Sequence, residues 1–223
     1  MVEHRSELGL RCKSDRAILR LAYRQIVIVS LTLLPPVLTS SASTQTFPLR
    51  SHLPHKKQAV WQIESGIVRT VTWLEDGTTV MTGLWGPGDV VGKLLSSVDP
   101  YQIECLARVE ASLLPLENGY IRSEWLLAHL EQFEALLVIR SYPQVETMLI
   151  KLLGWLAKRF GREVEAGNLI DLRLTHQTIA EALGTTRVTV TRILGQFEDQ
   201  GLIERISLHR ILLKEDELWH YEI

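Results

Sequence analysis

Apolar residues recur at about the 3.6-residue spacing of α-helices in two short segments that flank Gly184, near the C-terminal end of the chain. Thr175 precedes the first segment and Thr185 or Thr186 precedes the second, and threonine is a common helix N-cap. Gly184 suits the left-handed backbone that often follows a helix. The pattern therefore predicts a helix, a tight turn and a second helix that share one buried face. The apolar positions are Ile179, Ala180 and Leu183 in the first segment and Val190, Ile193, Leu194 and Phe197 in the second.

The opposite face of the second predicted helix is distinctive at its start. A solvent-facing helix start that is rich in Arg and Thr suits the major groove of DNA, where arginine pairs with guanine. The alternative is a helical hairpin that only packs against its neighbours. The residues expected on the solvent-facing side are Thr186, Arg187, Val188, Thr191 and Arg192.

Between Thr46 and Leu116 the pattern changes to short runs rich in Val, Ile, Thr and Trp, which turn signals separate. Many short strands with regularly placed glycines are typical of an antiparallel barrel or jelly roll. We therefore expect an all-β domain before the helices. The clearest runs span residues 58–64, 67–74 and 78–85, and the turns are Ser65-Gly66, Glu75-Asp76-Gly77 and Pro87-Gly88-Asp89.

Two longer helices are predicted between these regions, at residues 121–140 and 144–160. Pro143 disfavours a helical backbone at the residue before it, so the segment Ser141-Tyr142-Pro143 is a natural hinge. In the first helix, apolar residues alternate with spacings of four and three, as in the seam of a coiled coil. A helix docked only on its own barrel is the alternative. The seam residues are Leu126, Leu130, Phe133 and Leu137.

Charge and cysteine content narrow the function classes. The formal net charge of −2 excludes a generally basic nucleic-acid binder, so DNA binding must rest on a local basic face and on dimer symmetry. Cys12 and Cys105 form neither a CxxC pair nor a metal-ligand spacing, and we expect reduced thiols in a cytoplasmic protein. His52 and His55 lie beside a proline and two lysines, and we expect them to be exposed rather than to bind a metal or haem.

Residues 1–43 form an N-terminal extension whose role the sequence leaves open. Basic residues, an apolar run over 26–38 and a small polar stretch follow one another, which is the outline of a secretory signal. The run is shorter than the roughly 20 residues that span a bilayer, and Pro35-Pro36 interrupts it. We discount export and membrane attachment, because a DNA reader acts in the cytoplasm. A helix packed on the barrel, a partly disordered extension and a mis-assigned start remain open.

The stretches LTHQTIAEALG and TTRVTVTRILG resemble the helix–turn–helix of the Crp/Fnr family of bacterial regulators, most closely its branch of cyanobacterial global nitrogen regulators. SGIVR, EDG and GPGDVVG resemble the sensor roll of that family. The resemblance implies an α+β fold with an N-terminal antiparallel β-roll like a cyclic-nucleotide-binding jelly roll, a long dimerisation helix and a C-terminal winged helix–turn–helix. We expect the roll at 44–120, the dimerisation helix and hinge at 121–142, and the DNA-binding domain at 143–223.

The resemblance also implies a homodimer that binds a palindromic double-stranded site of the type GTA…TAC. Arg187, Val188 and Arg192 match the base-contacting positions. Val188 stands where cAMP receptor proteins carry a glutamate, and a valine favours a thymine methyl group over cytosine. The residues expected to contact the DNA backbone are Thr186, Thr189, His176 and Gln177. A β-hairpin wing is predicted at 202–213 and contains Arg205, His209 and Arg210. Thr191 and Arg210 complete the candidate set of DNA-binding residues.

The effector site departs from the family pattern. Cyclic-nucleotide members carry Gly-Glu-Leu and a later Arg that holds the phosphate, whereas here Lys93 replaces the Glu and that Arg is missing. The Arg that nitrogen regulators use for 2-oxoglutarate is missing too, although Lys93 or Arg108 could hold a carboxylate. We therefore expect no cofactor, no cAMP binding and a degenerate or altered pocket, with control by 2-oxoglutarate or another small anion left open. The candidate pocket residues are Val91, Gly92, Lys93, Leu94 and Tyr101.

Functions from other classes are weaker. A cupin-like enzyme needs clustered His and Glu ligands in the barrel, and residues 46–116 do not supply them. A protein-interaction module without DNA binding does not account for Arg187 and Arg192. We expect a transcription regulator, not an enzyme, with DNA, a second copy of the chain and RNA polymerase as partners.

Overall fold

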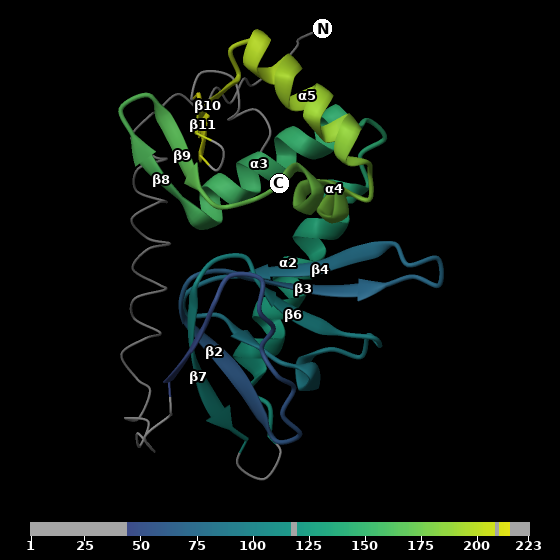
Figure 1. Cartoon of the computed structure of the whole chain (residues 1–223), viewed down its shortest axis with the longest axis vertical. Coiled ribbons are helices and arrows are strands. Elements are labelled where there is room, and N and C mark those ends of the chain that lie inside the picture. The colour runs from purple at the N-terminus through teal and green to yellow at the C-terminus, as the bar shows by residue number, and fades with distance from the viewer. Residues whose placement is uncertain (1–43, 117–119, 208–209, 215–223) are drawn as a thin grey trace, which may run out of the picture. The chain divides into compact units, whose positions relative to one another are not determined.

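The computed structural model describes residues 44–116, 120–207 and 210–214 (Figure 1). The predictions for the N-terminal extension, Cys12 and His209 lie outside these residues. Within the described part of the chain, no helix combines the length and the apolar character that crossing a bilayer requires.

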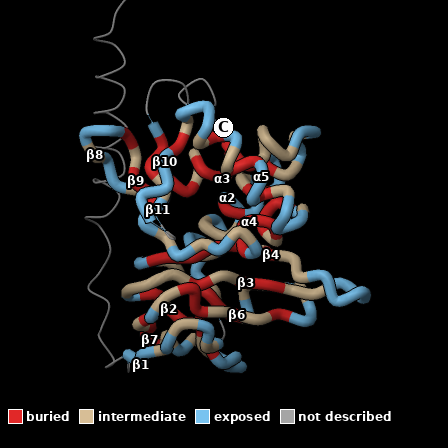
Figure 2. Tube along the Cα trace, turned by 45° about the horizontal axis from the view of Figure 1, so that its top comes forward, coloured by how far each residue is buried: buried red, intermediate tan, exposed pale blue. Residues whose placement is uncertain are grey.

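Two antiparallel sheets form the predicted β-roll, one with the strand order β1-β7-β2-β5 and the other with the order β4-β3-β6. Buried side chains from both sheets, among them Trp61, Val68, Trp85 and Ile103, fill its interior. Figure 2 shows buried segments along β2, β3 and β6. The strands are β1 (Thr44–Phe47), β2 (Ala59–Ser65), β3 (Val68–Trp73), β4 (Thr79–Trp85), β5 (Val90–Val91), β6 (Gln102–Cys105) and β7 (Val109–Pro115), with the short 3₁₀ helix η2 (Lys93–Leu95) after β5.

The hairpin between β3 and β4 confirms the strongest turn prediction. Gly77 adopts a φ of +82°, which a side chain would disfavour. The Thr78 amide donates to Asp76 Oδ1 at 2.8 Å, and Trp73 then pairs with Thr79. The three predicted runs match β2, β3 and β4 to within one residue. The remaining strands of the roll were not predicted individually.

Helices α2 (Ser123–Arg140) and α3 (Val145–Phe160) follow the roll. α2 begins two residues later than predicted, because Arg122 has an extended backbone. One side of α2 packs on the roll, where Gln132 Oε1 accepts from the Leu84 amide at 3.1 Å. His129 stacks on Trp85 with 4.0 Å between the ring centroids.

The C-terminal part contains α4 (His176–Leu183), α5 (Arg187–Asp199) and a sheet with the strand order β10-β11-β9-β8. The hairpin of β10 (Ile203–Ser207) and β11 (Arg210–Leu213) confirms the predicted wing. The hairpin of β8 (Gly161–Val164) and β9 (Gly167–Asp171) was not predicted; it follows directly after the predicted helix at 144–160. A shared apolar core joins α3, α4 and α5. The described elements of this part therefore form the predicted winged helix–turn–helix.

Candidate nucleic-acid interface

Threonine N-caps and one glycine with a left-handed backbone set the ends of α4 and α5, the two helices of the helix–turn–helix. The Thr175 hydroxyl accepts from the Thr178 amide at 3.1 Å and begins α4. Gly184, with a φ of +69°, ends α4. The Thr186 hydroxyl accepts from the Thr189 amide at 3.2 Å and begins α5. The cap of α5 is therefore Thr186, and the alternative Thr185 is excluded.

The two faces of α5 differ as the sequence pattern predicts. Val190, Ile193, Leu194 and Phe197 are all buried. Because 78% of Val188 is exposed, this valine makes no use of the core and is available to a partner. On the same side, the remaining residues expected to face solvent are all exposed: Thr186, Arg187, Thr191 and Arg192.

His176 links the two helices across the turn. Its Nδ1 atom lies 2.7 Å from the Thr191 hydroxyl, which itself donates to the Arg187 carbonyl at 2.8 Å. The threonine hydrogen is thus used, so Nδ1 of His176 must carry the proton and donate. Partial burial, and then the charges of Arg205 and Arg187, lower the pKa of His176 below its usual value. Nε2 of the neutral ring is left as an acceptor.

Arg192 is held by neighbours that the sequence pattern did not suggest. Its guanidinium donates to Gln196 Oε1 at 2.8 Å and lies 3.2 Å from Glu146 Oε1 at the start of α3. The backbone amide of Glu146 and then Arg192 lower the pKa of this carboxyl. Both side chains are about half exposed, so the pair is weak and an external phosphate or base can compete for the arginine.

The arginines of the wing are paired in the same way. Arg205 donates to Glu198 of α5, and this bond lowers the pKa of the Glu198 carboxyl. Arg210 Nε lies 3.0 Å from Asp171 Oδ1 of β9. These carboxylates lie on α5 and β9, outside the wing, so the sequence pattern of the wing did not indicate the pairs. The pairs reduce the free positive charge of the wing.

The candidate effector residues divide between the packed interior and the loop. Val91, Gly92 and Tyr101 are buried, and burial raises the pKa of the Tyr101 hydroxyl. Leu94 is exposed. Lys93 donates to the Val98 carbonyl and lies 3.3 Å from Asp99 Oδ1, so its charge is neutralised within its own loop.

The other candidates for effector or metal binding near the roll face solvent. Arg108, the second possible carboxylate partner, is exposed. His52 and His55 are exposed as predicted, and His55 Nε2 lies 2.8 Å from the Tyr101 carbonyl. His55 and Lys93 both lie near the buried Tyr101 ring, with 5.6 Å between the ring centroids of His55 and Tyr101 and 5.8 Å from Lys93 Nζ to the Tyr101 centroid.

The four predicted seam residues share the side of α2 that faces away from the roll. Leu126, Leu130, Phe133 and Leu137 are each between 48% and 57% exposed, whereas Leu136 and Ile139 on the opposite side are buried. A row of half-exposed large apolar side chains on one helix marks an interaction surface.

Comparisons with known proteins agree with this architecture. Residues 148–221 match the Crp-like helix–turn–helix domain. Regulatory protein CysR of Synechococcus elongatus is 44% identical over 182 residues, which cover 78% of this chain and 86% of that protein. The global nitrogen regulator of Synechocystis is 28% identical over 200 residues and 79% of this chain, with 86% of its own length covered. FixK2 from Bradyrhizobium japonicum has the same fold, with a TM-score of 0.68, 20% identity and coverage of 82% and 98%.

The chain therefore belongs to the Crp/Fnr family of transcription regulators, and the predicted family and fold are confirmed. Its relatives are regulators and not enzymes. Within the family, CysR is more similar to this chain than the nitrogen regulator of Synechocystis is, although the sequence pattern first suggested the nitrogen regulators.

Proposed function

We propose that this regulator binds, as a homodimer, a palindromic promoter site of the type GTA…TAC, and that no small molecule is needed for binding. The observation that carries the proposal is the exposed start of α5, where Arg187 and Val188 face solvent beside the N-cap Thr186. In this role, Arg187 pairs with guanine O6 and N7, and Val188 contacts a thymine methyl group. Arg192 leaves Glu146 to reach the groove.

Backbone contacts complete the proposed interface. Thr186 and Thr189 lie at the positive end of α5, where an anion is favoured. His176 and Gln177 lie in the equivalent first turn of α4. Protonation of Nε2 would give His176 a second donor for a phosphate. Thr191, which positions His176, and Arg210 of the wing complete the set.

The proposed dimer uses the exposed apolar side of α2. A parallel pair of these helices would cover Leu126, Leu130, Phe133 and Leu137 and place the two α5 helices about 34 Å apart, as successive major grooves require. RNA polymerase is the proposed downstream partner, by analogy with the family.

The proposed independence from an effector rests on the roll. Aromatic and aliphatic side chains, including Trp61 and Trp85, fill its interior. Of the two candidate cations for an anion, Lys93 is paired within its loop and Arg108 lies exposed on the surface of the roll. Neither a cyclic nucleotide nor 2-oxoglutarate finds a matched cation there, and an anion without one binds poorly.

A fluorescence anisotropy titration tests the proposal. The purified protein is titrated onto a GTA…TAC duplex and onto a scrambled duplex, each with and without 2-oxoglutarate or cAMP. We expect selective binding in the absence of both molecules. Binding that requires either one contradicts the effector-free proposal, and equal binding to both duplexes contradicts sequence-specific recognition.

A selection experiment tests the role of Val188. Glutamate at this position accepts from the exocyclic amine of cytosine, so Val188→Glu should shift the sequences enriched from a random duplex pool toward half-sites of the cAMP-receptor type. An unchanged set of selected sequences would show that Val188 does not contact bases.

A further inference from the structure

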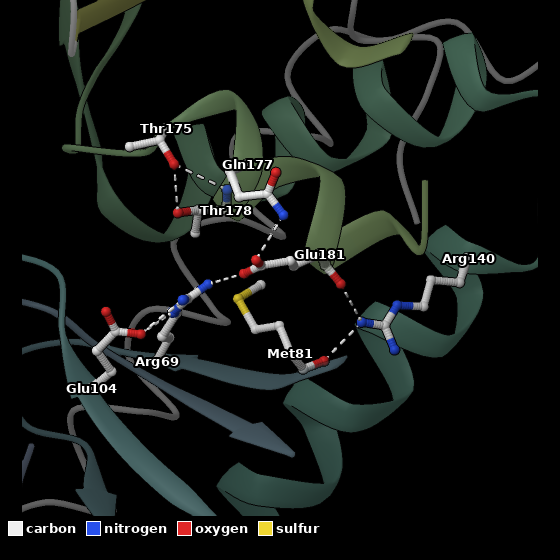
Figure 3. Close-up of polar contacts among 8 residues, drawn as sticks. All are labelled: Arg69, Met81, Glu104, Arg140, Thr175, Gln177, Thr178 and Glu181. Carbon is white, nitrogen blue, oxygen red and sulfur yellow. Dashed lines mark hydrogen bonds and ion pairs between the residues drawn. The ribbon is translucent and has the colours of Figure 1, made fainter. Parts of the chain in front are cut away.

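Arg69 of β3 joins the β-roll to the helix–turn–helix through two carboxylates. Its Nε and Nη2 atoms lie 2.8 and 2.7 Å from Glu104 Oε2 on β6, and its Nη1 donates to Glu181 Oε2 on α4. Only 12% of the Arg69 side chain and 13% of the Glu181 side chain are exposed. Figure 3 shows Arg69 between the two glutamates. All the described residues belong to one compact unit of the chain.

The position of Arg69 is fixed by the sheet. Arg69 and Glu104 are directly paired in the register of β3 and β6, so their side chains lie on the same face. This pairing directs the remaining guanidinium N–H groups toward α4. Burial of a charge is unfavourable unless the charge is paired, and loss of Arg69 would leave the mostly buried Glu181 carboxylate without its opposite charge. The ion pair between Arg69 and Glu181 therefore restrains α4 more firmly than a surface pair would.

Arg140, the last residue of α2, holds the other side of the same helical turn. Its Nε donates to the Ala182 carbonyl at 2.6 Å, and its Nη2 donates to the Met81 carbonyl of β4 at 2.7 Å (Figure 3 shows the second bond). Carbonyls in the last turn of a helix lack partners within the helix and favour a cation. The end of α4 is thus held to β3 by a side-chain ion pair and to α2 by the Arg140 side chain, whose guanidinium also donates to a carbonyl of β4.

The same network reaches the proposed DNA surface. Glu181 Oε1 accepts from Gln177 Nε2 at 2.8 Å, and Gln177 is exposed in the first turn of α4 (Figure 3). α4 also shares its buried core with α5 through Ile179 and Leu183. A displacement of α4 on the roll would therefore move both Gln177 and the recognition helix.

We propose that Arg69 and Glu181 are positioning residues for DNA recognition: their ion pair fixes α4 on the roll and so sets the place of α5 in the dimer. The inference rests on the proposed DNA-binding function. A palindrome requires two recognition helices at a fixed separation, whereas non-specific binding needs only phosphate contacts. Loss of the ion pair should thus weaken specific binding and leave non-specific binding nearly unchanged.

Glu181→Gln and Arg69→Met are the test variants, and Glu64→Gln is the matched control. The control removes a carboxylate from an exposed position on β2 of the roll and leaves the cluster of Arg69, Glu104 and Glu181 intact. Arg69→Lys, which keeps the positive charge beside both carboxylates, tests for rescue. Each protein is titrated onto the GTA…TAC and scrambled duplexes, and hydrogen exchange of α4 and of the roll is measured without DNA.

We expect Glu181→Gln and Arg69→Met to bind the specific duplex about tenfold more weakly, which corresponds to roughly 1.4 kcal/mol, with faster exchange in α4 and unchanged exchange in the roll. The control should stay within about twofold of the wild type, and Arg69→Lys should retain most of the affinity that Arg69→Met loses.

Faster exchange with unchanged specific affinity would reduce the pair to a purely structural role and overturn the proposal. A rise in specific affinity would also overturn it, because the pair would then hold an arrangement that excludes DNA. If the wild type itself does not select the duplex, the proposed function fails. Wild-type selectivity that persists in both test variants contradicts the positioning role alone.

Discussion

Arg187 at the start of α5 is exposed beside a helix N-terminus, whereas Lys93 in the η2 loop donates to a carbonyl of its own loop and faces Asp99. Both residues are candidate anion binders in the sequence, and both lie in segments that other Crp/Fnr members use for binding. Their surroundings separate them. An exposed cation without a partner in the fold can bind an external anion at less cost than a cation that must first leave a partner, and this difference is the basis for proposing DNA, rather than a small anion in the roll, as the ligand.

The proposed dimer is the most sensitive point of the comparison, because a palindrome offers one half-site to each of two α5 helices. Phe133→Glu introduces a charge into the exposed apolar side of α2. We expect a monomer that contacts a single half-site and binds the palindrome about 10²–10⁴-fold more weakly. Analytical ultracentrifugation and anisotropy titration measure the two effects. Phe133→Leu, which keeps the side apolar, is the control, and a Phe133→Glu protein that remains dimeric would exclude this side of α2 as the interface.

Removal of Arg187 tests directly whether this exposed arginine contacts DNA. Arg187→Ala should cost roughly 1–3 kcal/mol on the specific duplex and blur its guanine preference. Arg108→Ala removes the same charge from an exposed position on the roll and should leave DNA affinity nearly unchanged. Anisotropy titrations on the specific and scrambled duplexes separate the two roles. An equal loss on every duplex would identify Arg187 as a phosphate contact.

Local sequence signals predicted the elements whose structure is determined locally. Gly77 and Gly184 marked turns because each needs a positive φ, and the threonine before α5 marked its N-cap. The apolar spacing in α5 identified its buried face because a helix repeats along its own axis. Short strands without such periodicity, such as β5, depend on partners far away in the chain and were not predicted individually.

The sequence could not predict which charged side chains are free to bind a ligand and which are already paired within the fold. Arg192 was assigned to a base contact from its place on α5, but its partner Glu146 comes from α3. Arg69 carried no signal at all, because its partner Glu181 lies on α4, which is remote in sequence. The resemblance to the family indicated which segments bind ligands. Only the three-dimensional packing showed which charged side chains in those segments are already paired within the fold.

His129 bridges α2 and the roll, close to the η2 loop that carries Lys93. Its Nε2 lies 2.8 Å from the Val90 carbonyl, next to the η2 loop, and burial lowers the pKa of its imidazole below the usual value. The folded state therefore binds fewer protons than the unfolded state. The stability that results is complete above the unfolded pKa of about 6.5 and decreases as the pH falls through that value toward the folded pKa.

Urea unfolding at pH 7.5 and 5.5 measures this effect. Neutral His129 should contribute up to about 1.4 kcal/mol to the loss of unfolding free energy per unit of pH below 6.5. His129→Gln keeps a donor for Val90 and should show a smaller loss between the two pH values. The difference between pH 7.5 and 8.5 should be the same in both proteins and serves as the control. An equal loss in the variant at pH 5.5 would assign the pH dependence to other groups.

Lys93→Met should have the smallest effect. This variant tests whether Lys93 binds an external anion, as Arg187 is proposed to do, or only groups of its own loop. Asp99 is exposed, and a pair of this kind contributes about 0–1 kcal/mol, so we expect a stability change within that range and DNA affinity within about twofold of the wild type. Thermal unfolding with and without 2-oxoglutarate or cAMP is the decisive measurement. If the lysine serves only its own loop, neither molecule shifts the melting temperature of either protein. A shift in the wild type that Lys93→Met abolishes would mean that the loop releases Lys93 to an external anion, and the two cations would then differ only in which ligand each one binds.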